Sequence, residues 1–245
     1  LSYTICSGFE NNGGNRAHLS IVASSVADLK SKIEAASSAL KSAGDTFSDP
    51  GGISFTEKPL GAKGSVAFLF PGQGSQYPDM VKELAVIFPE VREAFERADK
   101  ALKGLFENDL SSYVFPVPSF TPEGEKAARK ALLKTNIAQS ALGAASMGIL
   151  SLLRSFGIAP DMAAGHSYGE YAALCASGSL DEESLFRVSE ARGRSMIEAA
   201  QGQDLGTMAA VKAGKKEVEE ALGGLDGVVI ANINSPRQTV ISGAK

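Results

Sequence analysis

The chain has 245 residues, of which 44% are hydrophobic and 21% charged, so it can form a sizeable core and more than one structural unit. Its net charge of -4 and its lack of tryptophan give no reason to expect nucleic acid or an anionic membrane surface as a partner. Cys6 and Cys175 are its only cysteines and lie far apart, so neither a disulfide framework nor a metal site is expected, and a reducing, cytoplasmic setting is favoured. No apolar run approaches the roughly 20 residues of a membrane helix, and the N-terminus does not resemble a signal peptide.

The first sixty residues predict a small α+β segment. A strand is expected over 18–23, then a helix with one apolar face that runs to Leu40, and then a loop over 42–52 that is rich in Ser, Gly and Asp. His18 precedes the strand with no carboxylate or second ligand nearby, which favours a surface histidine.

Val66–Phe70 is a continuous apolar run, which is typical of a strand buried on both faces of a parallel sheet. The loop after it, Pro71–Gln76, contains two glycines and two amide side chains. One interpretation makes Gln73 part of an oxyanion hole at the carboxyl end of the strand. The other is a polar turn, or a weak phosphate-binding loop without the lysine of a P-loop.

The middle of the chain predicts helices. Two are expected over 79–88 and 89–102, divided by Pro89 at a first helical position, and the proline-rich stretch 109–121 predicts a loop. Thr121-Pro122 is typical of a helix start, and a further helix is expected over 136–155, with Gly157 as its stop.

The stretch Gly165–Glu170 places Ser167 between a short apolar strand and an alanine-rich helix. Gly-x-Ser-x-Gly at such a turn is typical of a nucleophile elbow, in which small residues let strand and helix approach and leave the hydroxyl exposed. The first N–H groups of the helix and its dipole would favour a developing oxyanion there. The alternative is a glycine-rich turn with a buried serine.

After Gly178, the residues Ser179–Glu182 have capping-box spacing, so a helix is expected to continue to about residue 200. Arg192 shares one face of it with Leu185 and Met196, which predicts a partly buried guanidinium that needs an anion. That anion is either a local carboxylate, such as Glu170 or Glu190, or the carboxylate of a substrate.

The last forty residues predict a strand over 207–211, a helix over 215–222 and two strands over 228–233 and 239–241. This β-α-β-β order is an incomplete ferredoxin-like unit. The sequence therefore predicts three regions: a linker-like α+β segment over 1–62, a large α/β subdomain over 63–205 and the start of a small subdomain over 206–245.

Four motifs together resemble the malonyl-CoA:acyl-carrier-protein acyltransferase family. They are Phe70–Gln76, Gly165–Glu170, Ala191–Met196 and Asn232–Pro236, and they occur in the family's order over residues 65–245. Tyr3–Ile5 and the segment up to about residue 60 also resemble the linker before such domains in multidomain polyketide and polyunsaturated-fatty-acid synthases.

The resemblance implies a hydrolase-like α/β core in which Ser167 is the nucleophile and the amide N–H groups of Gln73 and Tyr168 form the oxyanion hole. It implies that Arg192 binds the free carboxylate of a malonyl-type acyl group, a task that suits the planar guanidinium. The acyl group would pass from coenzyme A to Ser167, and then to the phosphopantetheine thiol of an acyl carrier protein, with no bound cofactor or metal. A ketosynthase is expected as the neighbouring domain on the N-terminal side.

A serine nucleophile needs a general base, and the family uses a histidine further along the chain. Only His18 and His166 are present, and neither suits this role, so the base is expected beyond Lys245 together with the family's main substrate-selecting motif. The choice between malonyl, methylmalonyl and other units therefore stays open. Two alternatives also remain: a serine esterase or thioesterase, which uses the same elbow, and a non-catalytic docking domain of a synthase.

Overall fold

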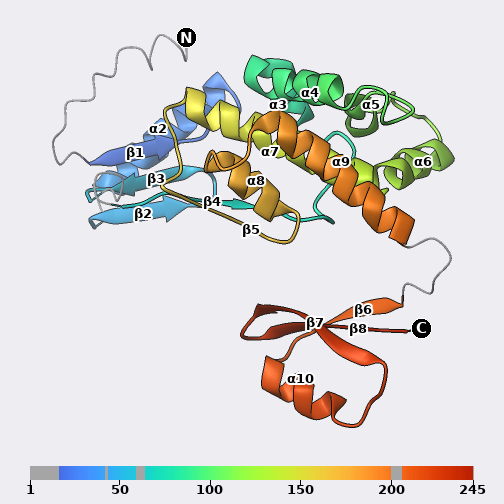
Figure 1. Ribbon diagram of the computed structural model, residues 1–245. Helices are drawn as coiled ribbons and strands as arrows, with labels where there is room; N and C mark the ends of the chain where they lie inside the picture. Colours follow the sequence, from blue (N-terminus) through green and yellow to red (C-terminus); the bar gives the residue numbers. More distant parts are fainter. Residues whose placement is uncertain (1–16, 42–43, 59–63, 200–205, 245) are drawn as a thin grey trace. The chain divides into compact units, whose positions relative to one another are not determined.

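The computed structural model describes residues 17–41, 44–58, 64–199 and 206–244 (Figure 1). It contains two compact units, residues 1–65 and 66–245, which are described here separately. Tyr3–Ile5, Cys6 and the predicted region boundaries near 62 and 205 lie outside the described residues.

The first unit is an antiparallel sheet with one helix. Its elements are β1 (His18–Ile21), α2 (Val26–Leu40), β2 (Thr46–Asp49) and β3 (Ile53–Thr56), with strand order β1-β3-β2. The predicted strand and helix are confirmed, but the prediction of a loop over 42–52 is wrong where β2 forms. Phe47 and Phe55 stack across the β2–β3 pair with ring centroids 5.6 Å apart, a contact between strands that local composition does not reveal.

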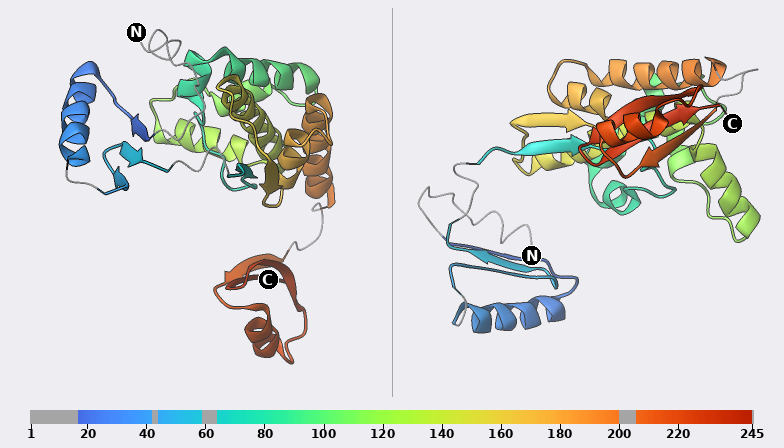
Figure 2. Two further views of the ribbon diagram at one scale, coloured as in Figure 1. Left: turned by 90° about the vertical axis from the view of Figure 1, so that its left-hand side faces the viewer. Right: turned by 90° about the horizontal axis from the view of Figure 1, so that it is seen from below.

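The second unit has a helical core around α7 (Thr135–Ser155), which packs against α4 (Pro89–Ala101) and α9 (Glu182–Ala199) (Figure 2). Shorter helices accompany them: α3 (Lys82–Ile87), α5 (Leu110–Val114), α6 (Pro122–Leu132) and α8 (Gly169–Ala176). By length and composition α7 could cross a membrane, contrary to the expectation from the sequence. Most of its residues are buried in this core, and that burial accounts for its apolar character.

A parallel pair of strands carries the two glycine-containing motifs. Strand β4 (Ala67–Phe70) pairs with β5 (Met162–Gly165), with Phe70 opposite Gly165, so both strands end at the same edge. The predicted parallel pairing is confirmed. The prediction that β4 is buried on both faces is wrong, because Phe70 is buried whereas Leu69, on the opposite face, is 79% exposed.

Three helical segments differ from the prediction. Helix α3 begins only at Lys82, because Asp79 and Val81 have left-handed backbones with φ of 63° and 56°. Within the predicted loop 109–121, residues of α5 form a turn of helix whose Leu110 and Val114 are buried. Helix α9 is capped by Asp181, which accepts a 2.8 Å hydrogen bond from the Ser184 N–H, and not by Ser179.

The helix starts and stops predicted for the middle of the chain are otherwise accurate. Thr121 accepts a 3.2 Å hydrogen bond from the Gly124 N–H and caps α6, with Pro122 in its first turn. Gly157 follows α7 with φ of 77°, a conformation that glycine adopts without strain.

The C-terminal region contains β6 (Thr207–Val211), α10 (Lys215–Leu222), β7 (Val228–Ser235) and β8 (Gln238–Gly243). The predicted β-α-β-β order is confirmed. All pairs in its sheet are antiparallel, with order β6-β8-β7, so β8 is the central strand. Its identification as part of a ferredoxin-like unit stays a prediction.

Candidate active site

Ser167 lies at a sharp turn between β5 and α8. Its backbone is left-handed with φ of 54°, an uncommon conformation for a residue other than glycine. The turn is closed by the Gly169 N–H, which donates to the His166 carbonyl at 2.9 Å, and by the Glu170 N–H, which donates to the Ser167 carbonyl at 3.2 Å. The predicted strand-to-helix turn is therefore present, and because Ser167 is exposed, the alternative of a buried serine is wrong.

Glycine is required on both sides of Ser167 because the backbones touch there. A Cβ atom on Gly165 would collide with the backbone of Gly169 and Glu170. A Cβ atom on Gly169 would collide with the carbonyl group of Phe70 at the end of β4. These contacts set the approach of helix α8 to the two strands.

The loop after β4 lies directly against the serine. A Cβ atom on Gly72 would be 2.5 Å from the His166 carbonyl oxygen and 3.3 Å from the Cβ atom of Ser167. Gln73, the next residue, is thereby brought beside the elbow. Among the described residues, the backbone N–H groups of Gln73 and Tyr168 have no acceptor, so two unpaired donors lie in the segments that flank the Ser167 hydroxyl.

The side chain of Gln73 is held by α7, through residues that the sequence analysis did not single out. Gln73 Nε2 donates to Thr135 Oγ1 at 3.4 Å, and Gln73 Oε1 accepts from Gln139 Nε2 at 3.0 Å. Gln139 is fully buried. The signal that could have revealed it is an amide within the run of small and apolar residues 137–150, one helical turn after Thr135.

Arg192 projects from α9 and is half-buried, as predicted. Its guanidinium lies 5.6 Å from the centre of the Tyr171 ring, a cation–π contact, and it forms no ion pair within the described ranges. Glu190 is instead paired with Arg194 at 3.3 Å, so the alternative of a structural pair between Arg192 and Glu190 is wrong.

The aromatic residues of α8 connect this arginine to the elbow. Tyr171 stacks on Tyr168, with ring centroids 6.1 Å apart. The buried Tyr168 hydroxyl lies 2.6 Å from Ser189 Oγ, which itself donates to the Leu185 carbonyl at 2.6 Å, so the tyrosine acts as the donor. Burial raises the pKa of Tyr168, which therefore keeps its proton.

Histidine is scarce around the serine. His166 is the only histidine in the second unit, and within the described residues neither its ring nor Ser167 Oγ forms a hydrogen bond. Its Nδ1 would be 3.0 Å from a Cβ atom on Gly72, so the ring lies against that loop. His18 belongs to β1 in the first unit. No group of three or more His, Cys, Asp or Glu residues that could hold a metal ion is found in the described ranges.

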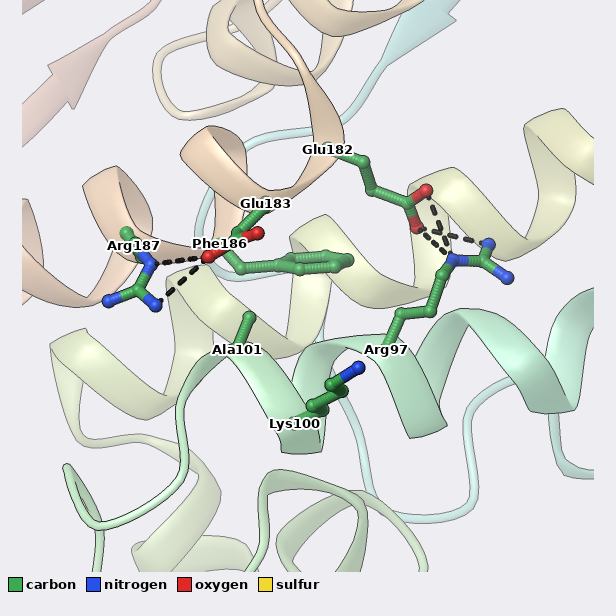
Figure 3. A pocket seen from close by; sticks show the side chains of 7 residues that line it. All are labelled: Arg97, Lys100, Ala101, Glu182, Glu183, Phe186 and Arg187. Atoms are coloured by element: carbon green, nitrogen blue, oxygen red, sulfur yellow. Dashed lines mark hydrogen bonds and ion pairs between the residues drawn. The ribbon is translucent and has the colours of Figure 1, made fainter.

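A separate surface pocket of about 300 Å³ lies between α4 and α9 and contains none of these residues (Figure 3). Its charges are largely paired, since Arg97 contacts Glu182 at 3.1 Å and Arg187 contacts Glu183 at 2.9 Å. Such internal pairing leaves little charge for a ligand. The elbow is therefore the stronger candidate site.

The second unit is similar to known proteins. Residues 67–245 match the family described as acyl transferase domain. The malonyl CoA-acyl carrier protein transacylase of Bacillus subtilis is 39% identical over 73% of the chain and 53% of its own length. One chain of the polyunsaturated fatty acid synthase of Thraustochytrium is 35% identical over 79% of the chain but only 7% of its own length.

Solved structures give the same result. A malonyl-transacylase in complex with a type II polyketide synthase acyl-carrier protein has a TM-score of 0.63 at 35% identity. The match covers 74% of the chain and 56% of the length of that transacylase. The acyltransferase domain from the second module of the salinomycin polyketide synthase has a TM-score of 0.74 at 27% identity. The match covers 100% of the chain and 52% of the length of that domain. The chain thus spans about half the length of these relatives and a small part of the multidomain synthase.

Proposed function

Because the chain belongs to the acyl transferase domain family, we propose that it takes part in moving a malonyl-type acyl group from coenzyme A to an acyl carrier protein. Ser167 Oγ attacks the thioester carbonyl and loses its proton to a base, and coenzyme A leaves as the thiol. The phosphopantetheine thiol of the carrier protein then attacks the acyl-serine, and the serine hydroxyl is restored. Coenzyme A thioester and carrier are substrates, and no bound cofactor takes part.

The observation that carries the proposal is an exposed serine in a left-handed turn, together with the N–H groups of Gln73 and Tyr168, which have no acceptor in the described part of the chain. Each of the two steps passes through a tetrahedral oxyanion. Backbone donors fixed beside the nucleophile stabilise that charge without having to reorganise. A role only in docking would not require this strained turn.

The surroundings of Arg192 favour an acyl group with a free carboxylate. Because Arg192 forms no ion pair with a described carboxylate, it can form a bidentate pair with such a substrate. The Tyr171 ring supports the guanidinium through its face and leaves the N–H groups free for the substrate. An esterase acting on simple acyl groups would gain nothing from this arginine.

The partners that we propose are an acyl carrier protein and the neighbouring domains of a synthase, with a ketosynthase on the N-terminal side, all in the cytoplasm. A structural relative was solved as a complex with an acyl-carrier protein. The match to a synthase acyltransferase domain covers the whole chain, whereas the malonyl-transacylase that was solved with its carrier protein covers 74% of it, which favours a first unit shared with multidomain synthases. By the same relationship we propose a hydrolase-like core and a ferredoxin-like small subdomain.

The general base in this proposal is a histidine beyond Lys245. In the described part of the second unit, the imidazole of His166 makes no hydrogen bond to the serine. A rate comparison tests this: the native polypeptide that carries this chain should acylate Ser167 at least roughly 100-fold faster than residues 1–245 alone. Equal rates would contradict an external base.

The main test is incubation of the native polypeptide with malonyl-CoA, followed by mass spectrometry of the peptide that contains Ser167. A malonyl adduct is expected, absent in Ser167→Ala and discharged by a carrier protein with phosphopantetheine. Rapid release of free malonate without a carrier would instead identify a hydrolase. Carrier binding without any adduct would identify a docking domain.

A further inference from the structure

Gln139 is a buried amide that packing alone does not explain. The side chain is fully buried, and its Oε1 is the one buried side-chain polar atom without a hydrogen-bond partner among the described residues. Burying an unpaired amide oxygen disfavours the folded state, and a leucine of similar size would avoid this. The reason for a glutamine here must therefore lie in what its Nε2 atom donates to.

Both contacts of that Nε2 atom lead toward the candidate site. It donates to Gln73 Oε1 at 3.0 Å and lies 3.6 Å from Met196 Sδ. Gln73 is in the loop that supplies a proposed oxyanion donor, and Met196 is one helical turn after Arg192 on α9. Gln139 on α7 thus joins the loop on one side of the site to the helix on the other.

The loop is held by its own hydrogen bonds, from the Gly74 N–H to Gln76 Oε1 at 2.7 Å and from Ser75 Oγ to the Gly72 carbonyl at 2.9 Å, but neither of them involves Gln73. Gly72 and Gly74 flank this residue, and Gly74 has φ of 110°. The backbone bond across the turn, from the Ser75 N–H to the Gly72 carbonyl, is 3.4 Å long. Two α7 side chains, Thr135 and Gln139, hold the amide of Gln73 from either end.

We propose that Gln139 is a positioning residue that fixes Gln73 and thereby aims its backbone N–H at the oxyanion. Gln139 touches neither substrate nor reacting atoms in this role. Because an oxyanion forms with every thioester, losing Gln139 affects all acyl groups alike, unlike losing Arg192. The inference deepens the function proposed above and rests on it.

The first test is Gln139→Leu in the native polypeptide. The acylation rate constant is expected to fall roughly 10- to 100-fold for both malonyl-CoA and acetyl-CoA, with little change in KM, because a misdirected donor affects the transition state. Ser140→Ala is the matched control, since Ser140 is equally buried but bonds only to the Asn136 carbonyl of its own helix. Rates for Gln139→Leu within about 2-fold of those of the Ser140→Ala control would overturn the inference.

A double-mutant cycle separates positioning from general destabilisation. Gln73→Ala removes the other partner of the bond but keeps the backbone N–H. If Gln139 acts through Gln73, the double variant acylates no more slowly than the slower of the two single variants. A rate reduction in the double variant equal to the product of the two single reductions would contradict the inference.

Hydrogen exchange gives a readout that does not depend on activity. The peptide covering residues 72–75 should exchange faster in Gln139→Leu than in Ser140→Ala. Unchanged exchange would overturn the inference even if no acyl-serine formed. If exchange of this peptide is faster in Gln139→Leu but the unmodified protein forms no acyl-serine adduct, only the proposed function fails.

Discussion

The two sides of the candidate site are held together by different kinds of contact. On the elbow side, the closest contacts are with backbone carbonyl groups: Gly169 lies against that of Phe70, and Gly72 against that of His166. On the α9 side, they are between side chains: Arg192 lies over Tyr171, which stacks on Tyr168. In the function that we propose, this difference separates two tasks: backbone donors serve any thioester, whereas a guanidinium on an aromatic face selects for a carboxylate.

The largest effect is expected from Gly169→Ala on the elbow side. The added Cβ atom collides with the Phe70 carbonyl group, which is fixed by the β4–β5 pairing and cannot yield. We expect a loss of about 3 kcal/mol in the free energy of unfolding, measured by denaturant titration, and loss of acylation with every thioester. Gly44→Ala, which meets only open space, is the control. Selective loss of malonyl transfer alone would contradict this division of tasks.

A smaller and selective effect is expected from Arg192→Ala. Loss of a charge-assisted pair with the substrate should lower kcat/KM for malonyl-CoA by roughly 10- to 100-fold, with little change for acetyl-CoA. The control is Arg187→Ala on the same helix, whose partner Glu183 is exposed. If malonyl and acetyl transfer fell equally, Arg192 would have no role in binding a carboxylate.

The smallest effect is expected from removing the aromatic support. Tyr171→Leu loses a cation–π contact worth about 0.5–1 kcal/mol, so KM for malonyl-CoA should rise roughly 2- to 5-fold. Tyr171→Phe keeps the ring and should behave as the unmodified protein. The measurement is KM for malonyl-CoA in both variants by steady-state kinetics. Equal increases in KM would assign the effect to the hydroxyl and not to the ring face.

Sequence reasoning was most accurate where a structure is encoded by neighbouring residues. The turn at Ser167, the cap at Thr121 and the stop at Gly157 each depend on contacts within a few residues. It failed where a distant partner decides the outcome. Strand β2 is stabilised because Phe47 stacks on Phe55, and α5 forms where Leu110 and Val114 pack into the core.

By itself, the sequence determined which residues we propose for the candidate site: Ser167 between its glycines, the Gln73 loop and Arg192. It left open what Arg192 pairs with, and it gave no weight to Gln139 or Tyr171. The tertiary structure decided these points, because burial and hydrogen-bond partners depend on how α7, α8 and α9 pack together. Glu190 is engaged by Arg194, Arg192 lies on Tyr171, and Gln139 reaches Gln73. Spacing along one helix defines a face, but only packing shows what that face meets.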